Sequence, residues 1–146
     1  MKLIVTTAAM LMAGSAIEPP SGPMPAATQE TRTPDVIYVP TPPEVVEAML
    51  DLAQVKDGDV PYDLGSGDGR IPIAAVKRAK IKATGIDIGP QRIAEANANA
   101  RAQGVEGQVT FKQADLFASD FSDASVITLY LLDTLNEKLR PKLLAE

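Results

Sequence analysis

The chain of 146 residues contains no cysteine, no histidine and no tryptophan. Without cysteine it cannot form disulfide bonds, thiolate metal sites or cysteine nucleophiles. Without histidine it cannot contain a Ser-His-Asp triad, a histidine general base or most kinds of zinc site. Any chemistry must therefore use carboxylates, hydroxyls, lysines, amides or a bound cofactor, and the sequence predicts no metal site.

Positive charge is also in short supply. The 14 lysines and arginines are outnumbered by 19 acidic residues, which gives a formal net charge of −5. Direct binding of nucleic acids depends on lysines and arginines that neutralise phosphates, and the sequence has no basic tract. We therefore expect no direct nucleic-acid binding. The apolar share of 45% is enough for the core of one modest domain.

Residues 1–16 are typical of a secretory signal peptide. Lys2 precedes an apolar run, and Gly14 and Ala16 supply small residues at a plausible cleavage site. The run is too short for a comfortable transmembrane helix, so we expect no stable membrane span. A buried helix or a misassigned start codon is the alternative. The signal predicts export to the periplasm or the medium, with a mature N-terminus near Ile17.

Residues 17–34 form a second, compositionally distinct segment. Five prolines stand there among small and polar residues. Such a segment cannot bury enough apolar surface to offset the entropy lost on ordering, and we interpret it as a flexible linker. The folded domain is predicted to cover residues 35–146.

Helical and extended patterns alternate through this domain. Thr41 is predicted to cap the first helix, with Pro42 at its first position and Glu44 completing a capping box. The expected strands are 60–64, 82–88, 109–113 and 126–131, and the expected helices are one after Thr41, 70–80, 90–104 and a final one interrupted by Pro141. The alternation predicts an α/β fold with a doubly wound parallel sheet of about four core strands.

Two of these elements have further expected features. The helix from residue 90 carries Ile93, Ala94, Ala98 and Ala102 as its apolar positions. Pro61 falls in what should be the central strand, where a proline is normally tolerated only at the first residue. We therefore expect that strand to begin at Pro61.

The most informative segment is residues 62–70, Tyr-Asp-Leu-Gly-Ser-Gly-Asp-Gly-Arg. An apolar strand ends in an acidic residue, three glycines follow at alternate positions, and a helix begins. Open α/β sheets bind nucleotide-like ligands at such a turn. The glycines allow a sharp turn and a close approach of the backbone to a ligand.

Three acidic residues stand at the carboxyl ends of three expected strands: Asp63, Asp87 and Asp115. In a parallel sheet these ends lie along one edge, beside the ligand crevice. Asp87 suits hydrogen bonds to two ribose hydroxyls, and Asp115 suits an adenine amino group. Each has a plainer interpretation as a turn cap, a helix cap or a solvated loop residue. Three in register with a glycine loop favour a ligand site.

The spacing of the glycines excludes the dinucleotide fingerprint. Gly-x-Gly-x-x-Gly would require a glycine at position 70, where the chain has Arg70. The loop resembles motif I of class I S-adenosylmethionine-dependent methyltransferases, with Asp87 as the acidic residue of the second strand. Residues 63–70, with Tyr-Val-Pro-Thr at 38–41, are most similar to DOT1-like and FAM173-type protein-lysine methyltransferases.

The resemblance implies S-adenosylmethionine as cofactor and a methyl acceptor, which in this group is a protein lysine. It places the methionine end of the cofactor beside the glycine loop, the ribose at Asp87 and the adenine at the third strand. The cofactor-binding residues it implies are Asp63, Gly65, Ser66, Gly67, Asp87, Asp115 and Leu116. Tyr130 and Asp133 are candidates for handling the acceptor's proton. The alternatives are a core position for Tyr130 and a helix N-cap for Asp133.

The chain also departs from that family's pattern. Class I methyltransferases have seven strands, whereas this sequence shows four before it ends at Glu146. We therefore expect a C-terminally truncated chain whose fourth strand is an exposed edge. A non-catalytic or vestigial nucleotide-binding domain is the alternative function, and an NAD-linked oxidoreductase is disfavoured by Arg70. The export signal conflicts with a cofactor that is made inside cells.

Overall fold

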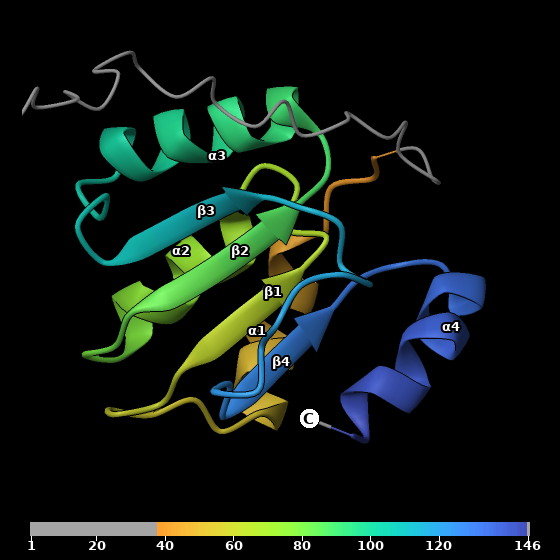
Figure 1. The fold of residues 1–146 in the computed structure, drawn as a ribbon. Helices are drawn as coiled ribbons and strands as arrows, with labels where there is room; N and C mark the ends of the chain where they lie inside the picture. Colours follow the sequence, from red (N-terminus) through yellow and green to blue (C-terminus); the bar gives the residue numbers. More distant parts are fainter. Residues whose placement is uncertain (1–37, 146) are drawn as a thin grey trace, which may run out of the picture.

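The computed structural model describes residues 38–145. The predicted signal peptide and linker lie outside the described residues and stay predictions. The elements within residues 38–145 follow the expected order (Figure 1). They are α1 (Pro43–Leu52), β1 (Pro61–Leu64), α2 (Arg70–Arg78), β2 (Ala83–Asp87), α3 (Pro90–Ala102), β3 (Val109–Gln113), β4 (Val126–Leu129) and α4 (Asp133–Leu143).

The strands form one parallel sheet in the order β3-β2-β1-β4, which confirms the predicted α/β fold. The chain moves outward from β1 to β3 and then returns to the other side of β1. This reversal creates a topological switch point between β1 and β4, where open α/β sheets bind ligands. Asp63 of β1 lies in register with Gly85 of β2 and Thr128 of β4. Within the described residues β4 is an edge strand, as expected.

Hydrophobic clusters lie on both faces of this sheet. One joins α1, α2 and α3 to the strands and includes Val46, Leu50 and Ile73. The other includes Tyr62 and Leu64 of β1, and Leu143 of α4 packs against it. Figure 1 shows α1 and α2 behind the sheet and α4 beside β4. Both faces of the central strand are covered, because all four of its residues are buried.

The central strand begins at Pro61, as expected. Because the proline is the first residue of β1, its missing N–H leaves the rest of the ladder intact. The preceding carbonyl of Val60 accepts a hydrogen bond from Ser125 N at 3.0 Å, which aligns β4 with β1. The position that looked incompatible with a central strand therefore marks its start.

The predicted capping box of α1 is wrong. The helix begins at Pro43, and the N-cap is Pro42, with no hydrogen bond from a capping side chain. Pro42 has the extended backbone of φ −57° and ψ 143° because the ring of Pro43 disfavours a helical conformation in the residue before it. Thr41 is instead buried, and its carbonyl faces Arg70.

Two expectations about α4 are also corrected. The N-cap is Leu132, so Asp133 is the first helical residue and makes no capping hydrogen bond. Its charge stabilises the positive end of the helix without capping it. Pro141 lies inside α4 and does not interrupt it. The proline falls in the last turn, where only two helical residues follow, so little of the hydrogen-bond ladder is lost.

The apolar face expected for α3 is rotated. Ala96 and Ala100 are buried, whereas Ala94 and Ala98 are exposed. Alanines are spread around this helix, so periodicity alone cannot select the buried face. The neighbouring backbone selects it, because a Cβ built on Gly69 would lie 3.0 Å from Ala96 Cβ. The buried alanines thus place α3 directly against the glycine loop.

Across residues 38–145 every helix is too short or too polar to cross a lipid bilayer.

Candidate active site

The glycine loop joins β1 to α2 in a conformation that only glycine adopts easily. Gly65, Gly67 and Gly69 have φ values of +83°, +52° and +80°, all in the left-handed region. The amides of Gly65 and Ser66 both donate to Ile86 O, at 2.8 and 3.0 Å. These bonds attach the turn to β2 and bring the carboxyl ends of β1 and β2 together.

Side chains of the protein occupy the space that a Cβ would need at these glycines. Leu131 lies against Gly65, and the Tyr38 ring lies over Gly67. The ring of Phe111 lies against Gly69. The glycines therefore serve packing as well as the turn. Gly65 remains open to the cavity described next, whereas Gly67 is not among the residues that line it.

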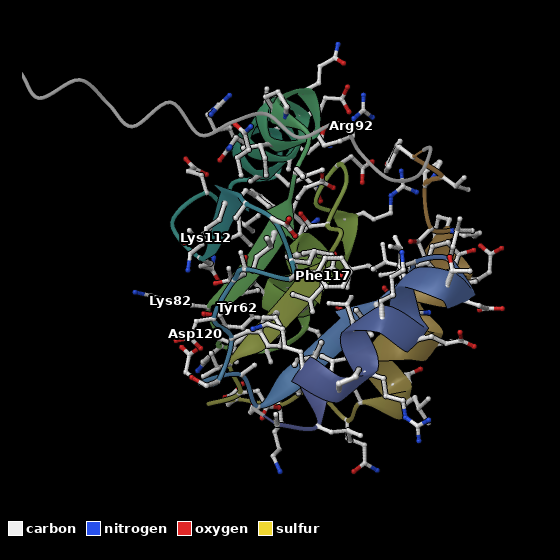
Figure 2. The ribbon with its side chains drawn as sticks, turned by 45° about the vertical axis from the view of Figure 1, so that its right-hand side comes forward. Tyr62, Lys82, Arg92, Lys112, Phe117 and Asp120 are labelled. Atoms are coloured by element: carbon white, nitrogen blue, oxygen red, sulfur yellow. The ribbon has the colours of Figure 1, made fainter. Side chains whose placement is uncertain are left out.

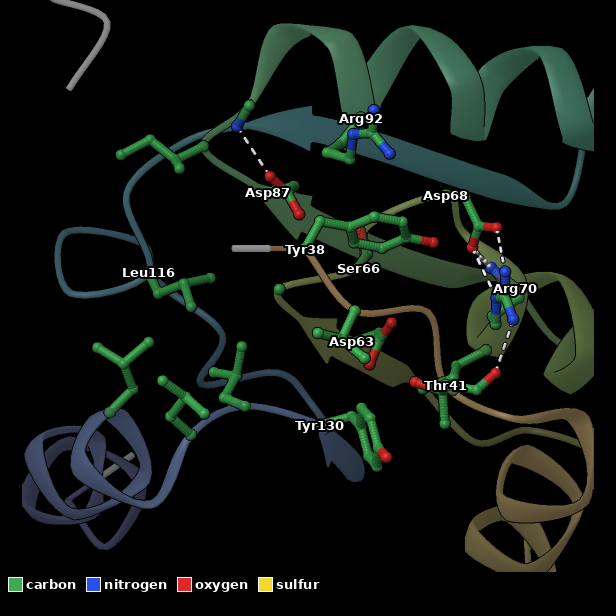
Figure 3. A pocket seen from close by; sticks show the side chains of 18 of the residues that line it. Tyr38, Thr41, Asp63, Ser66, Asp68, Arg70, Asp87, Arg92, Leu116 and Tyr130 are labelled. Atoms are coloured by element: carbon green, nitrogen blue, oxygen red, sulfur yellow. Dashed lines mark hydrogen bonds and ion pairs between the residues drawn. The ribbon is translucent and has the colours of Figure 1, made fainter. Parts of the chain in front are cut away.

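A cavity of about 850 Å³ opens at the carboxyl ends of the strands (Figure 3). Its volume lies within the range of roughly 300–1,000 Å³ that is typical of small-molecule sites. Seven of the residues predicted from the sequence line it: Asp63, Gly65, Ser66, Asp87, Asp115, Leu116 and Tyr130. Gly67 and Asp133 do not. The sequence-based site is thus assembled in one place, with two of its members outside the lining.

Asp63 is the buried carboxyl of the site. Its side chain accepts a hydrogen bond from Thr128 Oγ1 at 2.7 Å, across the β1–β4 pair. Burial raises the pKa of Asp63 to about 7, with the Thr128 bond opposing the rise and the negative charges of Asp87 and Asp68 adding to it. A carboxyl with such a pKa changes charge near neutral pH and can hold or accept a proton beside a ligand.

Asp87 connects two turns. Its Oδ2 accepts from Gly67 N at 2.9 Å, and its Oδ1 accepts from Gly89 N at 2.8 Å. The carboxylate therefore fixes the glycine loop to the start of α3, which is close to the plainer helix-capping interpretation. Each carboxylate oxygen has a further lone pair, so Asp87 can still accept hydrogen bonds from a ligand in the cavity.

Asp115 stabilises a local turn and also lines the cavity. Its Oδ1 accepts from Phe117 N at 2.9 Å, and its carbonyl accepts from Ser119 Oγ at 2.7 Å. These bonds shape the loop after β3 so that Leu116 and Phe117 also line the cavity. The apolar and the acidic side chain offer a flat, partly polar ligand group both contacts that it needs.

Ser66 provides independent evidence for a ligand. Its hydroxyl is buried at the cavity and has no hydrogen-bond partner among the described residues. A buried hydroxyl without a partner is costly, and native proteins rarely contain one without a functional reason. The side chain cannot turn away, because it packs against Gly85. A polar ligand group would satisfy it.

Sequence reasoning missed a group of four residues beside the glycine loop. Arg70 donates to Asp68 from Nε and Nη2, at 2.9 and 2.6 Å, and from Nη1 to Thr41 O at 2.7 Å. The Arg92 guanidinium lies over the Tyr38 ring, 4.6 Å from its centroid. Figure 3 shows these side chains along one wall of the cavity.

We call residues 38–41 the strap, because Arg70 and the stacked Tyr38 hold this segment against the glycine loop. Burial favours the neutral form of Asp68, but the bonds from Arg70 outweigh it and hold the pKa of Asp68 below its usual value. The signal for the strap was present in the sequence as Tyr-Val-Pro-Thr ahead of α1. The partnership with Arg70 had no local signal, because 29 residues separate it from Thr41.

The two candidates for proton handling differ in position. Tyr130 lines the cavity and is exposed, so the core interpretation is wrong. Asp133 is exposed on the first turn of α4 and is not among the lining residues. Tyr130 is therefore the better placed of the two. Within residues 38–145 no group of acidic side chains is arranged to hold a metal ion.

Comparisons with known proteins agree with this arrangement. The model of the ANTKMT methyltransferase domain family matches residues 63–146. A protein-lysine N-methyltransferase of Saccharolobus islandicus (strain REY15A) is 48% identical over 111 residues, which cover 75% of this chain and 69% of that protein. The adenine nucleotide translocase lysine N-methyltransferase of Mus musculus is 32% identical over 111 residues, covering 76% and 48%. The chain thus spans about half the length of this mouse relative.

A solved structure gives the same result. The crystal structure of an RNA methyltransferase from Salinibacter ruber, in complex with S-adenosyl-L-homocysteine, is 52% identical with a TM-score of 0.70. The match covers 72% of this chain and 69% of that one. The resemblance inferred from the glycine loop and the aspartates is confirmed, as is the S-adenosylmethionine-dependent class. The chain belongs to the ANTKMT methyltransferase domain family.

Proposed function

We propose that the cavity binds S-adenosylmethionine and that the protein transfers its methyl group to the side-chain amine of a protein lysine. The observation that carries the proposal is the meeting of Asp63, Asp87 and Asp115 around one cavity at the switch point of the sheet. The relatives named above as lysine N-methyltransferases support the acceptor.

The cavity contains groups that fit each part of the cofactor. The unpartnered hydroxyl of Ser66 and the carboxyl of Asp63 suit the polar methionine end. Asp87 retains acceptor capacity for the ribose hydroxyls, and Asp115 with Leu116 suits the adenine. This assignment runs from β1 to β3 along the sheet, and it is the residue set that the sequence predicted apart from Gly67.

S-adenosylmethionine, when bound, supplies a methyl group on a sulfonium: the amine nitrogen bonds to that carbon as the carbon–sulfur bond breaks, which leaves S-adenosylhomocysteine and a methylammonium. The chain's task is to align the amine, exclude water and receive its proton. Leu131 and Leu132 provide apolar walls, and Tyr130 can orient the amine. Asp63 lies at the same cavity with a pKa of about 7, which suits proton transfer near neutral pH.

Binding of the cofactor is tested by calorimetric titration of the full chain with S-adenosylhomocysteine. We expect Asp87→Ala to weaken binding by at least about tenfold, because it removes hydrogen bonds to a charged acceptor and loosens the glycine loop. Asp51→Ala is the matched control, since Asp51 is an exposed carboxylate on α1 away from the cavity. Undiminished binding by Asp87→Ala, or none by the wild type, would contradict the assignment.

Methyl transfer separates an active enzyme from a vestigial binding domain. The chain is incubated with isotopically labelled S-adenosylmethionine and a cell lysate, and modified residues are identified by mass spectrometry. Label on lysine supports the proposal. Cofactor binding without any transfer would instead favour the non-catalytic alternative.

An RNA acceptor is the second candidate, because the Salinibacter ruber structure is described as an RNA methyltransferase. The charge of this chain argues against it, since 14 basic residues face 19 acidic ones and RNA binding relies on cationic side chains. The same labelling experiment decides between them when the lysate is divided and treated with ribonuclease or protease. Label that is lost with ribonuclease would identify RNA as the acceptor.

A further inference from the structure

Exposed apolar side chains gather at the cavity. Eight large hydrophobic residues are exposed in the part of the chain that the structure describes, and five of them line the cavity. The five are Tyr38, Val39, Phe117, Tyr130 and Leu132. Such a concentration indicates a surface that becomes covered by a ligand or a partner.

The sheet order divides these side chains between two ends of the cavity. Phe117 follows β3, at the end where Asp115 and Leu116 suit the adenine. Tyr130 and Leu132 follow β4, on the opposite side of β1 and β2. The cofactor assigned above occupies the side of β1, β2 and β3. The residues after β4 therefore remain for the methyl acceptor.

Val39 extends this second group from the strap. Val39 is 58% exposed and Leu132 is 59% exposed, although both line the cavity. We call Val39, Tyr130 and Leu132 the apolar rim. It comes from two segments that lie about 90 residues apart in sequence and meet only through the fold, because the strap is held by Arg70.

The charged groups of the same cavity favour a cation. Four aspartates line it, Asp63, Asp68, Asp87 and Asp115, against the two arginines Arg70 and Arg92. Each arginine is already engaged, Arg70 with Asp68 and Arg92 with Glu95. An acceptor that combines a positive charge with apolar surroundings is complementary to this arrangement.

We propose that the apolar rim binds the residues next to the acceptor lysine, so that the protein prefers a lysine with large apolar neighbours over one with polar neighbours. This inference rests on the proposed lysine methyltransferase function. Apolar neighbours gain free energy by leaving water at Val39, Tyr130 and Leu132, whereas serine or aspartate neighbours do not.

The preference is tested with two synthetic peptides of about nine residues that have the same charge and a central lysine. One has leucines beside the lysine, and the other has serines. We expect the wild type to have a kcat/KM about tenfold or more higher for the leucine peptide, mainly through KM, because burial of two leucine side chains provides at least that factor.

Variants locate the effect. Leu132→Ser and Val39→Ser should lower the use of the leucine peptide severalfold and leave the serine peptide nearly unchanged. Leu144→Ser and Val60→Ser are the matched controls, since both residues are exposed and neither lines the cavity. Binding of S-adenosylhomocysteine by each variant verifies that the cofactor end of the cavity is intact.

The outcomes distinguish the inference from the proposed function. Equal use of both peptides by the wild type, or a loss caused equally by Leu144→Ser and Leu132→Ser, overturns the rim while lysine transfer stands. Absence of transfer to either peptide contradicts the lysine acceptor. In that case fluorescence anisotropy of the peptides with S-adenosylhomocysteine present decides the rim, and binding of the leucine peptide that Leu132→Ser does not weaken overturns it.

Discussion

Replacing Arg70 by alanine should destabilise the protein and weaken cofactor binding together. The guanidinium makes hydrogen bonds with Asp68 from two nitrogens and with Thr41 O from a third. It thereby joins the glycine loop to the strap, two segments that line the same cavity. No other arginine in residues 38–145 makes bonds to both of these segments.

The magnitude follows from what the substitution leaves behind. Asp68 is only 19% exposed and would lose its cationic partner. An incompletely solvated carboxylate without its partner costs roughly 2–4 kcal/mol, and the freed carbonyl of Thr41, which is itself buried, adds to this. We therefore expect Arg70→Ala to reduce the free energy of unfolding by about 3 kcal/mol, a large fraction of the 5–15 kcal/mol typical of a domain.

Arg78 offers a matched control. It also contacts carboxylates with two nitrogens, but its partners Glu47 and Asp51 are 61% and 73% exposed. Water can solvate those carboxylates when the arginine is removed. Arg78→Ala should therefore cost only about 0–1 kcal/mol. The contrast isolates the burial of the partner, since both substitutions remove the same side chain from the same helix.

Urea unfolding of both variants measures the difference, and titration with S-adenosylhomocysteine measures the effect on the cavity. We expect Arg70→Ala to bind the ligand severalfold more weakly, Arg70→Lys to recover part of the loss, and Arg78→Ala to bind normally. Equal destabilisation by the two alanine variants would refute the reasoning from burial. Normal ligand binding by a destabilised Arg70→Ala would show that the strap does not shape the site.

Three further predictions test other parts of the structure. Because the pKa of Asp63 is raised to about 7 by burial, its proton is bound more tightly in the folded state, so stability should fall as the pH rises from about 4 to 7. Asp63→Asn should flatten that fall and raise the stability at pH 8 by a few kcal/mol, measured by urea unfolding; parallel curves for variant and wild type would contradict the pKa shift. Gly67→Ala should reduce affinity for S-adenosylhomocysteine, because its Cβ would collide with the Tyr38 ring, whereas Gly58→Ala, also at positive φ but in open space, should cost only about 1 kcal/mol of stability and no affinity. Phe121→Ala should lower the free energy of unfolding by about 3–5 kcal/mol, because this side chain is almost fully buried beneath the loop after β3, and a loss below 1 kcal/mol in calorimetry would show that the loop is not anchored there.

The glycine loop shows how far local sequence reasoning reaches. Three glycines at alternate positions after an acidic strand residue require a left-handed turn, and all three have positive φ. Position 70 excluded a dinucleotide site without any structure. The reasoning did not show what covers each glycine. Tyr38 over Gly67 and Leu131 at Gly65 depend on segments that are distant in sequence.

Helix boundaries show a different limit. The capping box at Thr41 failed because the ring of Pro43 restricts the residue before it, a steric effect that a list of preferred caps does not include. The buried face of α3 failed because alanines surround the helix, and only the contact with the glycine loop distinguishes Ala96 from Ala94. Weak local preferences yield to packing in both cases.

The sequence by itself determined the parallel α/β order, the left-handed glycine turn and the acidic residues at the strand ends, because periodicity, glycine stereochemistry and strand polarity are local properties. Only the tertiary structure decided that Gly67 lies beneath Tyr38, that Asp133 stands apart from the cavity, and that Arg70 holds the strap. It also decided that Val39 and Leu132 line one cavity. These are relations between residues far apart in the chain, and they exist only once the sheet has brought its strand ends to one edge.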